Sequence, residues 1–141
     1  LKELFDRITV LYKAKFKESG IKFDTQIVPA DLSIEADLEL IEQILINLVQ
    51  NAMEAMQETS DPGLAINAWE NESGQVQISV SDNGAGISNE MLERIFLPFY
   101  STKTNKSGIG LSLSQQIMMQ HHGRLEVNSE SGKGATFILV F

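Results

Sequence analysis

The chain has 141 residues, of which 43% are hydrophobic and 21% charged, and its net charge is −8. We expect a single globular domain over residues 1–141, because a chain of this size supports one substantial core. The negative charge argues against nucleic acid and anionic membranes as partners, the absence of cysteine excludes disulfides and thiol chemistry, and no apolar run could span a membrane.

Apolar residues recur at helical spacing over residues 1–18, which predicts an amphipathic helix that ends before Gly20. The chain starts inside this helix and without methionine, so we expect it to continue from an upstream segment. Residues 21–27 alternate as a strand, and residues 32–36 are predicted to form a second short strand.

A long helix is predicted from Asp37, its N-cap, to about residue 57. Asparagine is a poor helix former, yet Asn47 and Asn51 stand one turn apart on the polar side of this helix. They indicate carboxamide oxygens that face a ligand, and Asn51 could give a hard oxygen to Mg²⁺. The alternative is a solvated helix face. At about 100° per residue, the same arc contains Gln43, Asn47, Gln50, Asn51 and Glu54.

Residues 64–70 and 76–80 alternate as two strands of an antiparallel hairpin. The second strand leads into residues 82–87, with the sequence DNGAGI. Asp82 can accept hydrogen bonds from the edge of a base, and the glycines after it let a ligand approach the backbone. The alternative is a tight Asn-Gly hairpin turn in which the aspartate makes an Asx turn.

A short helix is predicted from Ser88, its N-cap, until Pro98 stops it. Residues 99–107 contain small hydroxyl side chains and two lysines without periodicity, which predicts a mobile loop. Lys103 and Lys106 of this loop would be available to phosphate.

A helix is predicted to begin at residues 108–111, with the sequence GIGL, and to end before Gly123. The free N–H groups of such a helix start bind anions, although a glycine-rich start without a ligand is the alternative. Residues 124–128 and 135–141 form a last hairpin, whose apolar second strand should be central in the sheet. Thr136 is the polar member of that strand and a candidate to reach a base.

In this order the segments resemble the boxes of the ATP-binding domain of sensor histidine kinases, within the superfamily of gyrase-type, chaperone-type, histidine-kinase and mismatch-repair ATPases. Residues 47–52 are similar to the N box and residues 82–87 to the first glycine box. Residues 95–100 are similar to the phenylalanine box, residues 108–111 to the second glycine box and residues 132–137 to the closing one. The resemblance implies an α+β fold, an α/β sandwich in which a mixed, mostly antiparallel sheet packs against about three helices.

The resemblance also implies a role for each matching residue. Asp82 would bond the adenine amino group, and the glycines after it would let the base and sugar approach. Asn51 would hold Mg²⁺ with Asn47 beside it, and Asn51 and Lys103 would be catalytic. Residues 99–107 would form the mobile ATP lid. The residues implied to bind ATP are Asn47, Asn51, Asp82, Gly84, Gly86, Ile87, Tyr100, Thr102, Lys103, Gly108, Ile109, Gly110, Leu111 and Thr136.

Asn47 departs from the pattern of relatives that hydrolyse ATP, which have a glutamate at this place as the base for water. Glu42 cannot substitute, because nine residues of helix put it on the side opposite to Asn51. We therefore expect transfer of the γ-phosphoryl group to an acceptor other than water.

The resemblance implies that this acceptor is a histidine on an upstream helical hairpin, which also dimerises the parent kinase. His121 and His122 end a predicted helix, where cations are favoured, and we interpret both as structural. Residues 1–18 would be the lead-in helix from the hairpin. The further partner would be a response regulator, and the parent a homodimer with this domain in the cytoplasm.

Other functions remain open at this point. The same superfamily contains ATPases and serine kinases that phosphorylate an anti-sigma-factor antagonist. A degenerate regulatory module that holds nucleotide, or none, and acts through protein contacts is the alternative from a different class.

Overall fold

One mixed sheet organises the computed structural model, which describes residues 1–100 and 108–141. The strand order is β1-β2-β3-β5-β4; β1 and β2 are parallel, and the other neighbouring pairs are antiparallel. This arrangement confirms the predicted α+β class. The elements in chain order are α1 (Lys2–Glu18), β1 (Lys22–Val28), α2 (Leu38–Ala55), β2 (Gly63–Glu70), β3 (Val76–Asp82), α3 (Asn89–Leu92), α4 (Gly110–Gln120), β4 (Arg124–Ser129) and β5 (Ala135–Val140).

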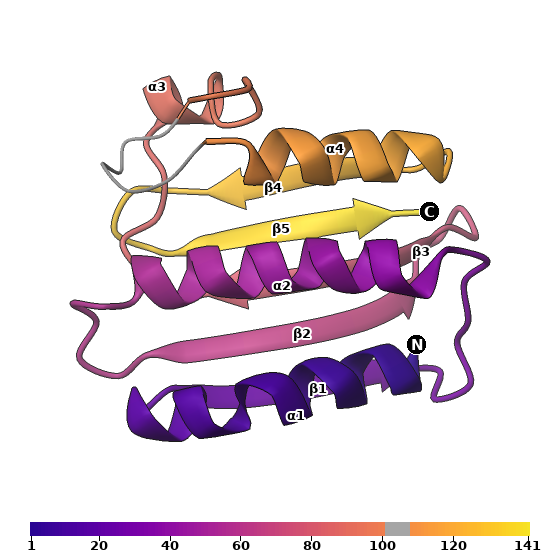
Figure 1. Ribbon diagram of the computed structural model, residues 1–141, viewed down its shortest axis with the longest axis horizontal. Helices are drawn as coiled ribbons and strands as arrows, with labels where there is room; N and C mark the ends of the chain where they lie inside the picture. Colours follow the sequence, from indigo (N-terminus) through magenta and orange to yellow (C-terminus); the bar gives the residue numbers. More distant parts are fainter. Residues whose placement is uncertain (101–107) are drawn as a thin grey trace.

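The three long helices, α1, α2 and α4, cover one face of the sheet as a single layer, with α2 in the middle (Figure 1). Strand β5 lies between β3 and β4, as its apolar composition predicted. None of the helices in the described ranges is long and apolar enough to cross a membrane.

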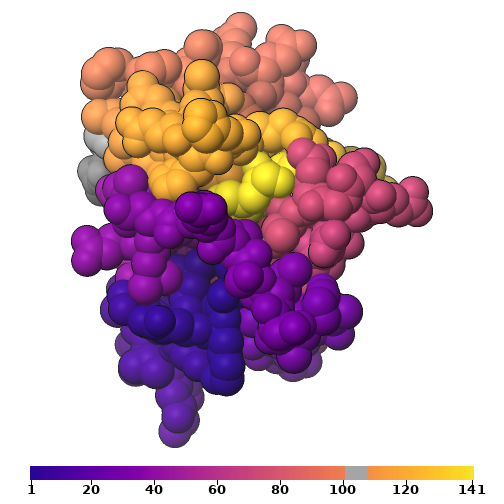
Figure 2. Space-filling model, turned by 90° about the vertical axis from the view of Figure 1, so that its right-hand side faces the viewer, coloured from indigo at the N-terminus to yellow at the C-terminus, as the bar shows by residue number. Residues whose placement is uncertain are grey.

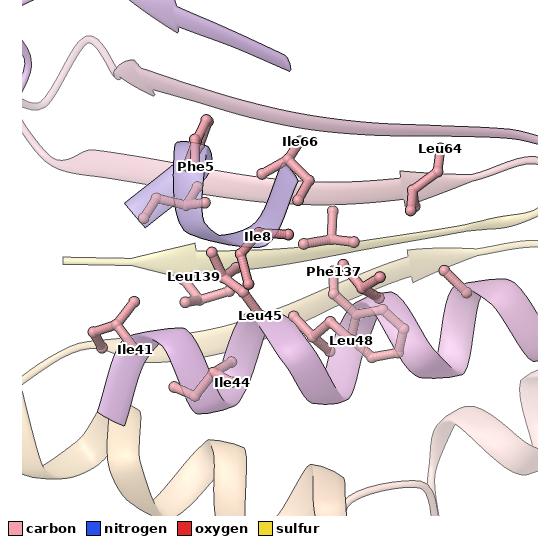
Figure 3. Close-up of a cluster of buried hydrophobic side chains, with 14 of the residues drawn as sticks. Phe5, Ile8, Ile41, Ile44, Leu45, Leu48, Leu64, Ile66, Phe137 and Leu139 are labelled. Atoms are coloured by element: carbon pink, nitrogen blue, oxygen red, sulfur yellow. The ribbon is translucent and has the colours of Figure 1, made fainter. Parts of the chain in front are cut away.

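The core lies between the helix layer and the sheet. Figure 3 shows Ile8 of α1 and Leu45 of α2 beside Ile66 and Leu139 of the sheet, and all four side chains are fully buried. Burying each such side chain stabilises the fold by roughly 1.5–3 kcal/mol. Helix α1 is therefore part of the core and not a detached extension. In the space-filling view its residues, in indigo, lie directly beneath those of α2 (Figure 2).

Residues 32–36, predicted as a short strand, form no strand in the structure. Leu32 is buried, and its backbone N–H donates to the carbonyl oxygen of Pro29. Ile34 and Ala36 are partly buried against the core. An extended loop that places every second side chain against the core shows the same two-residue hydrophobic period as a strand. This loop, however, pairs with no strand of the described sheet.

Two predicted helix starts differ in how they are capped. The carboxylate of Asp37 accepts hydrogen bonds from the N–H groups of Glu39 and Leu40 at the start of α2, as predicted. Ser88 occupies the N-cap of α3, but its hydroxyl makes no capping hydrogen bond and the helix has four residues.

Candidate functional site

A cavity of about 730 Å³ lies against the polar side of α2. Its other walls come from residues 82–87, the start of β5, the region of α3 and the start of α4. The predicted site residues that line it are Asn47, Asn51, Asp82, Gly86, Ile87, Tyr100, Gly108, Gly110 and Leu111. All five predicted boxes, distant in sequence, contribute residues to this one cavity, the closing box through Ala135 and Phe137.

Some predicted site residues are placed elsewhere. Gly84, Ile109 and Thr136 are not among the residues that line the cavity. The hydroxyl of Thr136 donates to Ser81 Oγ at 3.0 Å on the neighbouring strand. Of the predicted lid, residues 99–107, all but the first two residues fall on 101–107, outside the described part of the chain, and these include Thr102 and Lys103.

Asp82 ends β3 with its carboxylate at the cavity wall. Burial raises the pKa of this carboxyl group, and hydrogen bonds from the backbone N–H groups of Gly84 and Ala135 oppose the shift. The bond from Gly84 is 2.8 Å long and orients Oδ1. A partly buried acceptor held in this way is suited to a donor on a ligand, such as an exocyclic amino group.

The Asn-Gly pair after Asp82 is not a hairpin turn. Asn83 Oδ1 accepts a hydrogen bond from the Gly63 N–H, and its Nδ2 donates to the carbonyl oxygen of Asp61, both at 2.8 Å. The chain then leads to α3, and β3 pairs with β2 and β5. Asn83 therefore ties the glycine segment to the start of β2, and the hairpin alternative for this segment is wrong. The Asx turn that this alternative included is present, because Asp82 Oδ1 accepts a hydrogen bond from the Gly84 N–H.

Gly84 and Gly86 are required by contacts within the protein. A Cβ on Gly84 would lie 2.5 Å from the carbonyl oxygen of Ala55 in α2, and one on Gly86, whose φ is 68°, would overlap the carbonyl oxygen of Glu130. The two glycines thus let this segment pack between α2 and the turn before β5. Their first effect is to position Asp82, while Gly86 also lines the cavity.

The polar arc of α2 faces the cavity. Asn47, Gln50, Asn51 and Glu54 line it. The apolar side of the helix is buried in the core and consists of Ile41, Ile44, Leu45, Leu48, Val49 and Ala52. Along this helix Asn47 lies beside the start of α4, whereas Ala55 contacts the segment that contains Asp82. Eight residues separate these contacts, or about 12 Å of helix. The cavity therefore extends along α2, with Asn51 midway between its two ends.

Helix α4 starts at the end of the cavity opposite to Asp82. Its N-cap, Ile109, has no side-chain acceptor and makes no capping hydrogen bond. Gly108, Gly110 and Leu111 line the cavity around this start. First-turn N–H groups beside a cavity form an anion-binding arrangement, reinforced by the positive end of the helix dipole.

The described cavity wall carries acidic charge. Glu54, Glu58 and Asp82 line it, and no Lys, Arg or His is among its lining residues in the described ranges. Those ranges also hold no cluster of three or more His, Cys, Asp or Glu side chains that could bind a metal ion. A polyanionic ligand would therefore need positive charge beyond what these side chains offer.

An apolar wall completes the site, and sequence reasoning missed it. Met91, Ile95, Ala135 and Phe137 line the cavity. Met91 and Ile95 lie in the short helix predicted between Ser88 and Pro98, but helical spacing does not say which surface they face. Such side chains suit the faces of a flat heterocycle.

Glu42 and His121 lie away from the cavity. Glu42 forms an ion pair with Arg7 of α1 at 3.2 Å, in agreement with its predicted place on the far side of α2. His121 contacts Asp37 and Ile117. The structure thus gives His121 the predicted structural role.

The same arrangement occurs in known proteins. The profile of histidine kinase-, DNA gyrase B- and HSP90-like ATPases matches residues 36–141. The chain belongs to this family. Helix α1 precedes the matched range, but an alignment with the signal transduction histidine-protein kinase AtoS of Escherichia coli strain K12 covers 99% of the chain at 35% identity. The chain spans only 23% of the length of AtoS.

Solved structures of this ATPase family agree with the assignment. The catalytic domain of histidine kinase ThkA superposes with a TM-score of 0.88 at 35% identity, covering 100% of this chain and 91% of that one. ThkA in complex with response regulator protein TrrA gives a TM-score of 0.82 at 34% identity, covering 100% and 40%. Full-length ShkA in complex with AMPPNP gives 0.85 at 28% identity, covering 98% and 29%. Within the family, the chain is a catalytic domain of the histidine-kinase type, as the order of its boxes predicted.

Proposed function

We propose that this domain binds Mg-ATP in the cavity along α2 and donates the γ-phosphoryl group to a histidine on an upstream domain of a two-component sensor kinase. The observation that carries the proposal is the cavity itself. It has a hydrogen-bond acceptor, Asp82, at one end, the start of α4 at the other and Asn51 between them. Its length of about 12 Å suits a nucleotide that lies along the helix.

Adenine would occupy the end near Asp82. The carboxylate would accept a hydrogen bond from the exocyclic amino group, and Ile87, Met91 and Ile95 would contact the ring. This pairing favours adenine over guanine, because guanine presents a carbonyl oxygen at the corresponding position and would face the carboxylate oxygen without a hydrogen.

The phosphates would occupy the end formed by Gly108 and Gly110, where they would accept from the first N–H groups of α4. The described wall adds only acidic charge, so a triphosphate there needs a cation. Asn51 can offer one neutral oxygen, which fits Mg²⁺ because this ion commonly takes its other ligands from phosphates and water. Bound there, the ion would neutralise charge on the transferring group. We assign Thr102 and Lys103 of the predicted lid to the same phosphates.

Transfer to an acceptor is favoured over hydrolysis by the residue one turn before Asn51. Asn47 stands there, and an amide cannot take a proton from water as a carboxylate does. Glu42 is held by Arg7 on the other side of the helix. Glu54 lies near the adenine end, beside the contact of Ala55 with Gly84. These placements leave the attacking group to be supplied by another domain.

We propose that this other domain precedes α1 in the parent protein and contains the phosphoacceptor histidine and the dimer interface. Because the chain spans 23% of AtoS, most of a protein of that kind would lie outside it. The complex of ThkA with a response regulator supports a regulator as the next acceptor. The parent would be a homodimer with this domain in the cytoplasm.

The test is a calorimetric titration of the 141-residue chain with Mg-ATP, with phosphate release followed in the same sample. We expect saturable binding with negligible release, and labelling of a histidine hairpin when that domain is added in trans. Steady release without an acceptor would assign the chain to the ATPases. Transfer to serine would assign it to the serine kinases. Absence of binding would identify a degenerate module and contradict the proposal.

A further inference from the structure

Ser114 joins α4 to α2 behind the cavity wall. Its Oγ accepts a hydrogen bond from Asn47 Nδ2 at 3.1 Å and donates to the carbonyl oxygen of Gly110 at 2.9 Å. Ser114 is 2% exposed and does not line the cavity, whereas both of its partners do. Its hydroxyl therefore connects two lining residues without contacting what the cavity holds.

The other end of the Asn47 carboxamide is held as well. A Cβ on Gly110 would overlap Asn47 Oδ1, so the first residue of α4 packs directly on this oxygen. With Nδ2 on Ser114 and Oδ1 against Gly110, the amide has one orientation. Because Ile109 gives no side-chain cap, these contacts fix the first turn of α4 relative to α2.

We propose that Ser114 is a positioning residue for the triphosphate. It holds Asn47 and the first turn of α4 where the N–H groups of that turn would meet the phosphates. This inference rests on the proposed function, and it adds a residue that none of the predicted boxes contains. Hydrogen bonds weaken steeply with distance and angle, so a small shift of the turn lowers phosphate binding while base binding at Asp82 is unaffected.

The test compares Mg-ATP with adenosine, which lacks phosphates, as ligands of Ser114→Ala. This variant loses both hydrogen bonds and leaves Asn47 Nδ2 without its acceptor. We expect the Kd for Mg-ATP, from calorimetry, to rise about tenfold. The Kd for adenosine, from an NMR titration, should stay within about twofold. If Ser114→Ala only disturbed the fold, the Kd values for Mg-ATP and adenosine would instead rise together.

Ser112→Ala is the matched control. Ser112 is also buried in α4, but its hydroxyl donates to the carbonyl oxygen of Ile109 within its own helix. It removes one buried hydroxyl without touching the link to α2. We expect it to bind both ligands as the wild type does.

A second variant, Asn47→Ala, keeps the inference testable if Ser114→Ala folds poorly, and combining the two variants completes a double-mutant cycle. In Asn47→Ala the serine can still donate to Gly110, so this variant loses the link at lower cost to the fold. Adding Ser114→Ala to it should change the Mg-ATP Kd by less than about twofold, because the shared link is already gone. If wild type binds Mg-ATP but Ser114→Ala binds it equally well, or loses both ligands equally, the inference is wrong. If wild type does not bind Mg-ATP, both the inference and the proposed function fail.

Discussion

His121, at the C-cap of α4, accepts a hydrogen bond at Nε2 from the backbone N–H of Asp37, the N-cap of α2, at 3.1 Å. Its Nδ1 lies 2.8 Å from the carbonyl oxygen of Ile117 and donates to it. One imidazole ring thus links the end of α4 to the start of α2. Together with Ser114 near the start of α4, which bonds Asn47 in the middle of α2, it attaches both ends of α4 to α2.

This link predicts that His121→Ala destabilises the domain by about 0.5–1.5 kcal/mol, because the side-chain hydrogen bonds to the Asp37 N–H and the Ile117 carbonyl oxygen are lost. Urea unfolding measures the change as a lower midpoint. His122→Asn is the control, since His122 is exposed with a φ of 57° and asparagine tolerates that conformation. Equal midpoints for the two variants would show that the link contributes nothing to stability.

Asp82→Asn should weaken Mg-ATP binding while raising stability at neutral pH. The amide offers the adenine amino group a weaker acceptor, so we expect a loss of about tenfold to a hundredfold in affinity, measured by calorimetry. Its own Oδ1 can still accept from Gly84. An unchanged affinity would exclude Asp82 from the base site.

The stability effect of Asp82→Asn has a definite pH dependence. Burial raises the folded-state pKa of this carboxyl group above its unfolded value. The contribution of the neutral acid is fully present below the unfolded pKa and is lost as pH rises through the folded pKa. Thermal melts should therefore show the variant more stable at pH 7, with the difference shrinking at acidic pH. A difference that grows on acidification would mean that the carboxylate is stabilising.

Gly110→Ala tests the contact with Asn47. The new methyl group would overlap Asn47 Oδ1, so we expect a loss of about 1–3 kcal/mol in stability from overpacking. In an Asn47→Ala background the same substitution should be neutral or stabilising by up to about 1 kcal/mol, because alanine is the better helix former. Urea unfolding of the four proteins gives the coupling. The same sign in both backgrounds would contradict the contact.

Tyr12→Phe tests how α1 is attached to α2. Tyr12 is 3% exposed, stacks on Phe16 and shares a hydrogen bond with Gln50. Phenylalanine keeps the stacking and loses the hydrogen bond, so we expect a cost of about 1 kcal/mol at pH 7.

The same variant should respond differently to alkaline pH. Burial raises the pKa of Tyr12, although the bond with Gln50 opposes the shift. The stability due to the neutral phenol is fully present below the unfolded pKa and is lost as pH rises through the folded pKa. Chemical unfolding at several pH values above neutrality should show wild type losing more stability than the variant. Parallel losses would place the phenol in water.

The sequence was sufficient to predict most of the secondary structure, because hydrophobic periodicity and the residues that cap helices or form turns decide it locally. The buried arc of α2, the cap at Asp37 and the central place of β5 all follow from residue type and spacing. Residues 32–36 are the exception, because their alternating pattern predicted a strand that does not form. Alternating burial needs only an extended chain beside a core, whereas a strand also needs a partner.

The sequence by itself also identified candidate side chains for a nucleotide. Residue type and spacing put Asp82 at the end of a strand before two glycines and Asn51 on the polar side of a helix. Tertiary structure alone decided how they are held. Gly84 and Gly86 are needed by packing against Ala55 and Glu130, contacts between distant parts of the chain. Met91 and Phe137 become a cavity wall only when α3 and β5 face α2. Ser114 gains its role from Asn47, 67 residues away, and such a contact has no signature in local spacing.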